Sequence, residues 1–344
     1  STHRHTLFPY TTLFRSDPHP SLSRMLRRGS VSRFTLGRLL ATAGLLLALS
    51  FIVFVLLYLM PGDPAQNLLG VRAANPETLA QVRAQYHLDD PFLVQYLHWL
   101  GSVAHGDFGQ SIRSDESVLS LLGSRVILTI QLVLYAFVIT VLIAVPLGVI
   151  SAWRSGGPLD RGASTAAIVG VGAPSYAVGL LLLYVFGVQF GLFPVYGSGD
   201  DGLDRFTHLT LPAVTLAIGL GALVLKLTRT AVLAELDQDY VAFARSRGLT
   251  NRQIQVLVLR NALLPVITSL GLVLTFLFGG TILVEITFAL PGIGSLLANS
   301  VTYKDVPVVQ AVTLLTAAVI ALVALAVDLL YFAVDPRVRK RAAA

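Results

Sequence analysis

Long stretches without a single charged side chain constrain this sequence more than any other feature. Each is near or above the roughly 17–25 residues that an α-helix needs to cross a hydrocarbon core of about 30 Å. Hydrophobic residues make up 54% of the chain and charged residues only 13%, which is too few charges for an ordinary soluble domain. One such stretch could be a buried core helix, but six of them predict a chain that crosses a membrane repeatedly. The six stretches are residues 39–60, 126–153, 162–199, 209–225, 261–284 and 306–327.

The fold class that follows is an all-α membrane protein with six transmembrane helices. A helix satisfies its backbone hydrogen bonds internally, as the bilayer core demands. The third helix, near residues 163–190, contains Gly170, Gly172 and Pro174. Small residues favour close helix packing there, and a kink at Pro174 and Ser175 that lines a pathway is the alternative. The other helices are expected near residues 39–60, 126–152, 264–283 and 308–330, and the fourth runs from about residue 209 past Lys226 and Arg229 into the cytoplasm.

Basic residues are distributed unevenly between the two sides that these helices define. They concentrate before the first helix, at Arg154 and Arg161, between the fourth and fifth helices, and at the C-terminal end. The positive-inside rule places those segments, and therefore both termini, in the cytoplasm. Residues 61–124 then form an extracytoplasmic loop, whose mixed charges predict a small folded domain. The net charge of +6 follows the helix ends and forms no groove-sized patch, which argues against a nucleic-acid partner.

The most distinctive polar segment is residues 239–265, between the fourth and fifth predicted helices. Tyr240, Phe243 and Ala244 share one helical face by their spacing. Gly248 can adopt the positive φ that ends such a helix. Thr250 with Gln253 then forms a capping box for the next helix. The pattern predicts two short helices joined by a corner, which is suited to docking at a membrane surface.

This segment resembles the cytoplasmic coupling loop, or EAA loop, of the permease subunits of bacterial ABC importers, in the dipeptide, oligopeptide and nickel branch. The Ala-rich turn and the following glycine of that loop correspond to Ala242, Ala244 and Gly248. The glutamate that names the loop is absent, and the gap from Gly248 to Pro265 is longer than in the general pattern. Other strings agree in order: Pro-Gly-Asp-Pro at 61–64 closes the first helix, and Asp-Pro-Arg at 335–337 closes the last.

The resemblance implies a type I ABC importer permease fold in the bacterial inner membrane. It also implies a second homologous permease subunit, two cytoplasmic ABC ATPases and an extracytoplasmic substrate-binding protein as partners. Within the coupling loop, residues 235–263, the candidates for ATPase contact are Tyr240, Ala242, Ala244, Arg245, Gly248, Leu249 and Thr250. The transported solute, whether peptide, nickel or another small molecule, is not encoded in these motifs.

Two further groups of candidates come from the outer side and the membrane. Asp89, Asp90, Asp200 and Asp201 are acidic residues in the two outer loops and are candidates for contact with the binding protein. In the outer loop, Tyr96 and Trp99 are expected at headgroup depth, with substrate contact as the alternative. Ser175 and Glu285 are the pathway candidates. Glu285 stands toward a helix end, where we expect water or headgroups to reach it, and a helix-end structural role is its alternative.

Several chemistries are excluded by the residues. The chain has no cysteine, so it has no disulfide and no thiolate metal site. No lysine follows a glycine, which excludes a Walker A loop, and no histidine precedes a glutamate, which excludes the HExxH zinc site. We therefore expect no catalytic residues, metal or cofactor. An ion-coupled secondary transporter is the alternative function, although such proteins usually carry ionisable residues deep in the membrane.

The two ends of the sequence are set apart from this organisation. Residues 6–16 read as the in-frame translation of a common sequencing-library adapter, so residues 1–24 are expected to be a cloning scar, with Met25 as the native start. The expected order is then the N-terminus and first helix (25–60), the outer loop domain (61–124), the transmembrane permease domain (125–336) and a basic cytoplasmic tail (337–344).

Overall fold

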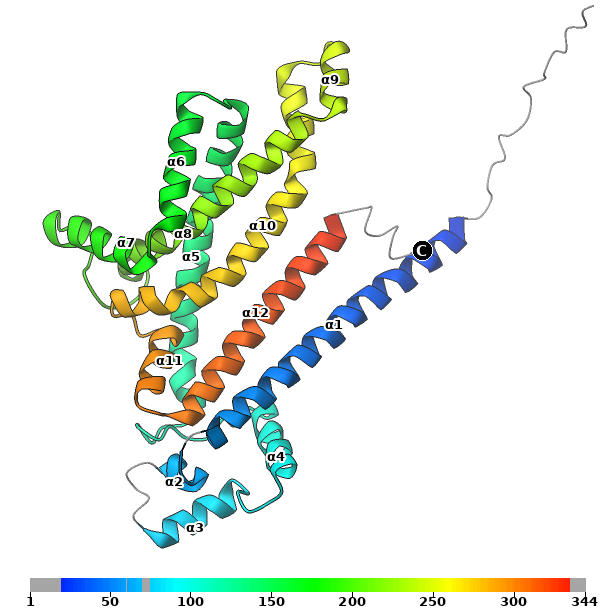
Figure 1. Ribbon diagram of the computed structural model, residues 1–344. Helices are drawn as coiled ribbons and strands as arrows, with labels where there is room; N and C mark the ends of the chain where they lie inside the picture. The colour runs from blue at the N-terminus through cyan, green and yellow to red at the C-terminus, as the bar shows by residue number, and fades with distance from the viewer. Residues whose placement is uncertain (1–19, 60, 70–74, 335–344) are drawn as a thin grey trace, which may run out of the picture.

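The computed structural model describes residues 20–59, 61–69 and 75–334, which are helical almost throughout (Figure 1). Five helices are long and apolar enough to cross a membrane, and a bent pair of shorter helices makes a sixth crossing if it counts as one. Among the described residues, the β pairing is limited to one isolated bridge between Gln110 and Ser117. The all-α membrane class is therefore confirmed. The long helices are α1 (Pro20–Leu59), α5 (Val118–Trp153), α8 (Leu203–Leu236), α10 (Asn251–Thr287) and α12 (Val306–Val334).

Shorter helices connect and extend these five. The segment after α1 folds into three of them, the central bundle contains a bent pair, and the remaining two lie at opposite ends of α10 (Figure 1). They are α2 (Pro64–Leu69), α3 (Pro76–Gln85), α4 (Phe92–Ala104), α6 (Pro158–Gly172), α7 (Ser175–Leu182) with its π-helical continuation η2 (Leu183–Gln189), α9 (Asp239–Ser246) and α11 (Ile293–Thr302).

Helix α8 lies at the centre of the bundle, in contact with α5, α6 and α10. Glycine allows the closest approaches. A Cβ atom on Gly148 of α5 would lie 2.8 Å from the carbonyl oxygen of Leu225, and one on Gly170 of α6 would lie 2.9 Å from the Cβ of Ala222. Any side chain at these positions would force the helices apart. The predicted packing role of Gly170 is confirmed, whereas Gly172 has open space around it.

The predicted third transmembrane helix is not one helix. Helix α6 ends at Gly172, α7 begins at Ser175, and the two axes are bent by 108°. Pro174 explains the break, because it has no N–H to continue the hydrogen bonds of α6 and it restricts the preceding residue to extended backbone. Ala173 indeed has φ −79° and ψ 126°. The chain therefore turns sideways where we expected a kinked but continuous span.

Other helices are longer than predicted. Helix α5 begins at Val118, inside the segment assigned to the outer loop, and α8 begins at Leu203 instead of near residue 209. Two short helices were predicted on either side of Gly248. The second of them is the first part of α10, which is 37 residues long and contains Pro265. Hydropathy reports the stretch that lipid covers, whereas a helix continues as long as its backbone hydrogen bonds do.

The described part of the segment between α1 and α5, residues 61–69 and 75–117, contains α2, α3 and α4. Helix α4 rests on α1 through aromatic rings: the ring of Phe54 lies 5.5 Å from those of Tyr96 and Trp99, measured between centroids. The hydroxyl groups of Tyr96 and Ser50 are 2.8 Å apart. Tyr96 and Trp99 thus contact α1, and both remain only half-buried.

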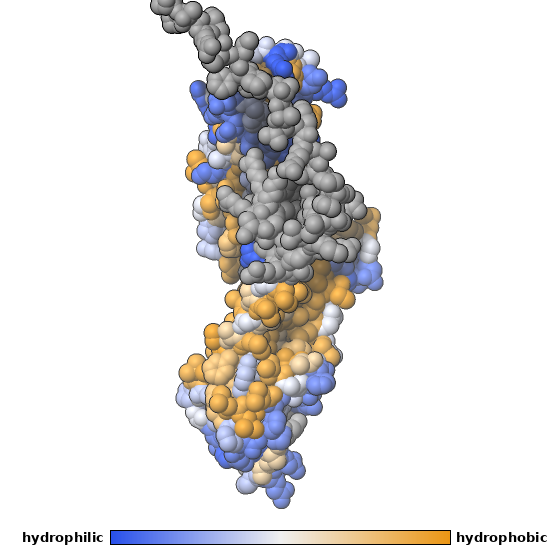
Figure 2. Space-filling view, turned by 90° about the vertical axis from the view of Figure 1, so that its right-hand side faces the viewer, coloured by the Kyte–Doolittle hydropathy of each residue, from blue (hydrophilic) through white to orange (hydrophobic). Residues whose placement is uncertain are grey.

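Hydrophobic side chains gather in the middle of the molecule and hydrophilic ones at its two ends (Figure 2). Helices α2, α3 and α4 lie at one end and α9 at the other (Figure 1). Helix α1 begins, and α12 ends, in the half of the molecule that holds α9. Residues 20–24 of the N-terminal segment that we expected to be a disordered cloning scar (residues 1–24) form the start of α1, whereas residues 1–19 and the basic tail, residues 337–344, lie outside the described residues.

Candidate functional site

The candidate site is the corner at residues 239–253, where α9 and its turn join α8 to α10; we call it the α9 corner. Gly248 has φ +75°, a left-handed conformation that suits glycine. The Leu249 N–H donates to the Ala244 carbonyl (3.1 Å) and the Gly248 N–H to the Arg245 carbonyl (3.0 Å). This is the Schellman arrangement that ends a helix and fixes the direction of the chain after it. The predicted role of Gly248 as a helix terminator is confirmed.

Thr250 begins the next helix as predicted. Its side chain accepts a hydrogen bond from the Gln253 N–H, and the Gln253 side chain accepts one from the Thr250 N–H (2.9 Å). This capping box satisfies two backbone donors that the start of α10 would otherwise leave unpaired. The corner is thus held by local hydrogen bonds on both sides of Gly248.

One face of α9 is buried against the ends of α5, α8 and α10. Val241 and Ala244, three positions apart, are the buried residues of α9. They belong to a cluster that also contains Ala152, Val232, Ile254, Val258 and Ala262. Phe243, which shares a helical face with Tyr240 and Ala244 by its spacing, is 60% exposed, so the buried stripe of α9 is formed by Val241 and Ala244. A helix of 8 residues buries only a narrow stripe, which the apolar pattern alone did not locate.

The opposite face of α9 combines apolar and cationic groups. Ala242, Phe243, Arg245 and Arg247 are exposed, as is Leu249 after the turn. The Arg247 guanidinium lies 5.0 Å from the centroid of the Phe243 ring, within the range of a cation–π contact. Exposed aromatic and arginine side chains on a rigid, short helix are typical of a protein-binding surface.

Tyr240 anchors the start of α9 to α8. Its hydroxyl donates to the Glu235 carboxylate at 2.7 Å. Partial burial, together with this acceptor, raises the pKa of Tyr240 above its usual value. The phenol therefore stays protonated and keeps its donor role at physiological pH.

A buried ion pair braces the same end of the molecule. The Asp160 carboxylate, near the start of α6, accepts hydrogen bonds from Arg229 of α8 through Nε (2.6 Å) and Nη2 (2.9 Å). It also accepts from the Ser151 hydroxyl and the Gly156 N–H. These contacts tie the turn between α5 and α6 to α8. Sequence reasoning missed this pair, because its two residues are 69 positions apart and each stands beside an uncharged stretch.

Comparison with known proteins decides which family has this architecture. The profile described as "Binding-protein-dependent transport system inner membrane component" matches residues 144–340. The profile for the N-terminal part of the same membrane component matches residues 31–133. The chain belongs to this family. Its members are membrane permeases of ABC importers and not enzymes, so the protein is a multi-pass permease subunit that works with ATPases and a substrate-binding protein.

Individual relatives agree with the family. A putative peptide permease protein of Brucella suis is 40% identical over 317 residues, which cover 89% of this chain and 99% of the relative. A probable peptide ABC transporter permease protein of Sinorhizobium fredii is 35% identical, with the same coverage. The glutathione transport system permease protein GsiC of Salmonella typhimurium is 37% identical over 308 residues, 89% of this chain and 98% of GsiC.

Among solved structures, an inward-facing MetNI methionine ABC transporter contains a chain with the same fold. The TM-score is 0.53 at 20% identity, and the match covers 63% of this permease and 97% of that chain. The predicted importer permease fold is confirmed, and the alternative of an ion-coupled secondary transporter was wrong, because the family is driven by separate ATPases.

Of the acidic candidates of the permease, Asp89, Asp200 and Asp201 are exposed and Asp90 is half-buried. Asp89 lies 3.4 Å from the Arg83 guanidinium, which also pairs with Asp63 at 2.6 Å. Asp90 stands beside two histidines. In the other outer loop, Asp201 is 3.5 Å from Arg205, and the Asp200 N–H donates to the Asp204 carboxylate.

The two pathway candidates occupy different environments. Ser175 is half-buried at the 108° bend, as the first residue of α7. Glu285 is fully buried, so our expectation that water or headgroups reach it was wrong. Its carboxyl group accepts hydrogen bonds from the Thr129 hydroxyl (2.7 Å) and the Ser295 N–H (2.8 Å). The permease places Glu285 where α5, α10 and α11 meet.

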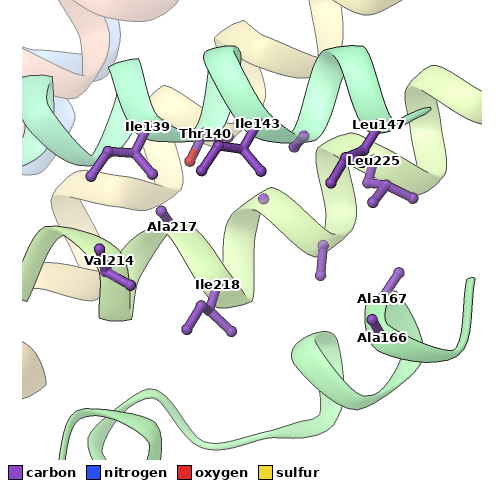
Figure 3. Close-up of a pocket in the computed structure, with 13 residues that line it drawn as sticks. Ile139, Thr140, Ile143, Leu147, Ala166, Ala167, Val214, Ala217, Ile218 and Leu225 are labelled. Carbon is purple, nitrogen blue, oxygen red and sulfur yellow. The ribbon is translucent and has the colours of Figure 1, made fainter. Parts of the chain in front are cut away.

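A hollow lies between α5, α6 and α8 (Figure 3). Its volume is about 250 Å³, and Ile139 and Ile143 of α5 and Ile218 of α8 are among the residues that line it. Thr140 is the polar residue among aliphatic ones in this lining. A hollow of this chemistry suits a lipid chain or an apolar side chain better than a polar solute.

Proposed function

We propose that this permease is one of two related membrane subunits of a peptide importer, and that its α9 corner seats in a groove on a cytoplasmic ATPase. The observation that carries the proposal is the construction of the corner. Its buried face is fixed to the ends of three long helices, and its other face presents Phe243, Arg245 and Arg247 to solvent. A displacement of α9 therefore moves α5, α8 and α10 together, which is the property that coupling requires.

Peptides are the proposed solute class. The relatives from Brucella suis and Sinorhizobium fredii are named as peptide permeases, and the Salmonella typhimurium relative transports glutathione, itself a short peptide. The outer surface formed by residues 61–124 with the loop at Asp200 and Asp201 is the proposed seat of the binding protein. The exposure of Asp89, Asp200 and Asp201 supports that assignment.

We infer that α9 and both termini face the cytoplasm, and that α2, α3 and α4 face outward. The concentration of basic residues around α9 supports this orientation, as does the position of α1 and α12 relative to α9 (Figure 1). The chain has no cysteine, so single cysteines can report the sidedness. In intact spheroplasts, Ser114→Cys should react with an impermeant maleimide, and Ser246→Cys should react only after lysis.

Both positions are exposed, which makes them a matched pair for this labelling. Lysed cells provide the control, since both variants should then label equally. Labelling of Ser246→Cys in intact spheroplasts would contradict the proposed orientation and, with it, contact between α9 and a cytoplasmic ATPase.

The coupling role predicts a specific effect at Gly248. A β-branched residue at φ +75° is strained by roughly 1–2 kcal/mol or more, although a Cβ there meets no atom of the chain within 4 Å. Gly248→Val should therefore insert normally but misdirect the turn. We expect transport-linked ATP hydrolysis in the reconstituted complex to fall about 5- to 30-fold, the factor to which that strain corresponds.

Gly248→Asn is the matched control, because asparagine is close to valine in size but tolerates left-handed backbone. It should retain most of the activity. Thr250→Ala, which removes one cap worth about 1 kcal/mol, should give an intermediate loss. If all three variants hydrolyse ATP and transport like the unaltered permease at equal expression, the α9 corner is only a connection and the coupling proposal is wrong.

A further inference from the structure

Two histidines and an aspartate come together between α3 and α4, away from the α9 corner. Their ligand atoms all lie within 4.8 Å of one another. The Asp90 Oδ2 atom is 3.6 Å from His87 Nδ1 and 3.7 Å from His98 Nδ1, and the two imidazole centroids are 4.2 Å apart. Neither imidazole is hydrogen-bonded to Asp90, since both separations exceed the roughly 3.2 Å limit of an N–H···O bond.

The spacing is close to that of a coordination sphere. A tetrahedral ion with bonds of about 2.1 Å holds its ligand atoms about 3.4 Å apart. The two distances from Asp90 Oδ2, 3.6 and 3.7 Å, are a few tenths of an ångström longer than this, and all the ligand atoms lie within 4.8 Å of one another. Side-chain rotation alone can close such a gap. Two imidazoles with one carboxylate match the preferences of Zn²⁺, Ni²⁺, Cu²⁺ and Co²⁺, whereas Mg²⁺ and Ca²⁺ prefer oxygen ligands throughout.

The backbone holds His87 in place at an energetic cost. Its φ is +53°, and the Leu88 N–H donates to the Arg83 carbonyl at 2.9 Å, which puts His87 at the position that glycine usually occupies when a helix ends. A non-glycine residue there costs on the order of 1 kcal/mol. A histidine in this position is unfavourable for the turn itself, so its presence favours a role for the imidazole.

The turn is fixed to α4 without any contribution from the three side chains. The buried Gln95 amide donates to the Leu88 carbonyl (2.9 Å) and to the Asp90 carbonyl (2.7 Å). Gln95 lies three positions before His98 on α4, so it holds the backbone of Asp90 beside that histidine. The site is therefore preorganised, and replacing a ligand should not unfold the loop.

Both histidines also line a cavity of about 280 Å³, whose walls include Tyr58, Trp99 and Asp107. The two imidazole side chains are 52% and 49% exposed. An ion held by three protein ligands in this position keeps at least one coordination position open to water or to another ligand.

We propose that His87, Asp90 and His98 form a binding site for a divalent transition-metal ion of the Zn²⁺ class. The ion clips the turn between α3 and α4 to the body of α4. Under the orientation proposed above, the site faces the extracytoplasmic medium and takes its ion from there.

The test is metal binding by the purified full chain in detergent, prepared without a polyhistidine tag. Co²⁺ is followed by its visible absorption, and Zn²⁺ by competition with a chromophoric chelator. The unaltered protein should bind one Zn²⁺ more than His87→Gly does. His98→Ala should lower the Zn²⁺ affinity at least tenfold, because the loss of a residue that only hydrogen-bonds to a metal ligand already lowers metal affinity by that factor. His87→Gly is informative because glycine suits φ +53°, so lost binding cannot be attributed to a broken turn.

His105→Ala is the control, because His105 lies at the end of the same α4 helix and contacts the Gly101 carbonyl instead of the cluster. It should bind metal like the unaltered protein, and histidines outside the cluster contribute the same background to every variant. Equal Zn²⁺ affinity in the unaltered protein, His87→Gly and His98→Ala would overturn the proposal, as would competition by Mg²⁺ at the same concentration as Zn²⁺. Neither result depends on the ATPase, so the outcome is separate from that of the coupling experiment.

Discussion

Replacing Glu285 with alanine should lower the free energy of unfolding of the permease by about 2–4 kcal/mol, because two buried donors would lose their acceptor. The side chain is fully buried in the described structure, and its carboxyl oxygens accept from the Thr129 hydroxyl of α5 and the Ser295 N–H of α11. Thr129 in turn accepts a hydrogen bond from the Ile293 N–H at 2.9 Å. One side chain thus connects three helices.

Gly292 and Gly294 lie against the Glu285 carboxyl group, which fits a structural role for this side chain. A Cβ on Gly294 would lie 3.0 Å from Glu285 Oε2 and 2.7 Å from the Ile282 Cα, and a Cβ on Gly292 would overlap the carboxyl group itself. The turn at residues 291–294 therefore encloses Glu285 with backbone instead of side chains.

Glu285→Gln is the matched control, since it keeps the volume and one acceptor oxygen. We expect it to lose about half as much stability as Glu285→Ala, measured as the shift in SDS-induced unfolding from mixed micelles. A different result would restore the pathway role: if Glu285→Gln unfolds like the unaltered protein but transports far less, the carboxyl group acts on the solute and not on the fold.

Replacing Arg229 with methionine should destabilise the permease by about 3–5 kcal/mol, the cost of leaving a buried charge without its partner. The Asp160 carboxylate is 5% exposed and would retain only Ser151 and Gly156 as hydrogen-bond donors. The turn between α5 and α6 would then lose the two hydrogen bonds that tie Asp160 to α8. Because α5 and α8 also carry the cluster beneath α9, we expect the coupling activity to fall with the stability.

The double variant Asp160→Asn with Arg229→Met should recover part of the loss, since it removes both charges. Together with the single variant Asp160→Asn, it completes a double-mutant cycle that gives the interaction energy of the pair. Lys226→Met is the control: Lys226 lies one turn earlier on α8 and is exposed, so its loss should change stability by less than about 0.5 kcal/mol. Equal melting temperatures for Arg229→Met and Lys226→Met in detergent would show that the ion pair does not brace this end of the molecule.

The sequence predicted features that neighbouring residues determine together. Uncharged stretches located the membrane crossings, because a bilayer accepts long apolar helices and few alternatives. Gly248 and Thr250 marked the end of one helix and the start of another, because a Schellman turn and a capping box need only residues within one helical turn of each other.

The tertiary structure alone decided how the helices meet. The direction of the chain after Pro174, the pairing of Asp160 with Arg229 and the burial of Glu285 beside Thr129 each depend on residues far apart in the sequence. The hydropathy pattern predicted that Glu285 lies at a solvent-accessible helix end, because hydropathy describes each helix without its neighbours. Which helices touch is set by close approaches such as Gly148 to Leu225, and a single sequence does not identify which small residue on one helix faces which position on another.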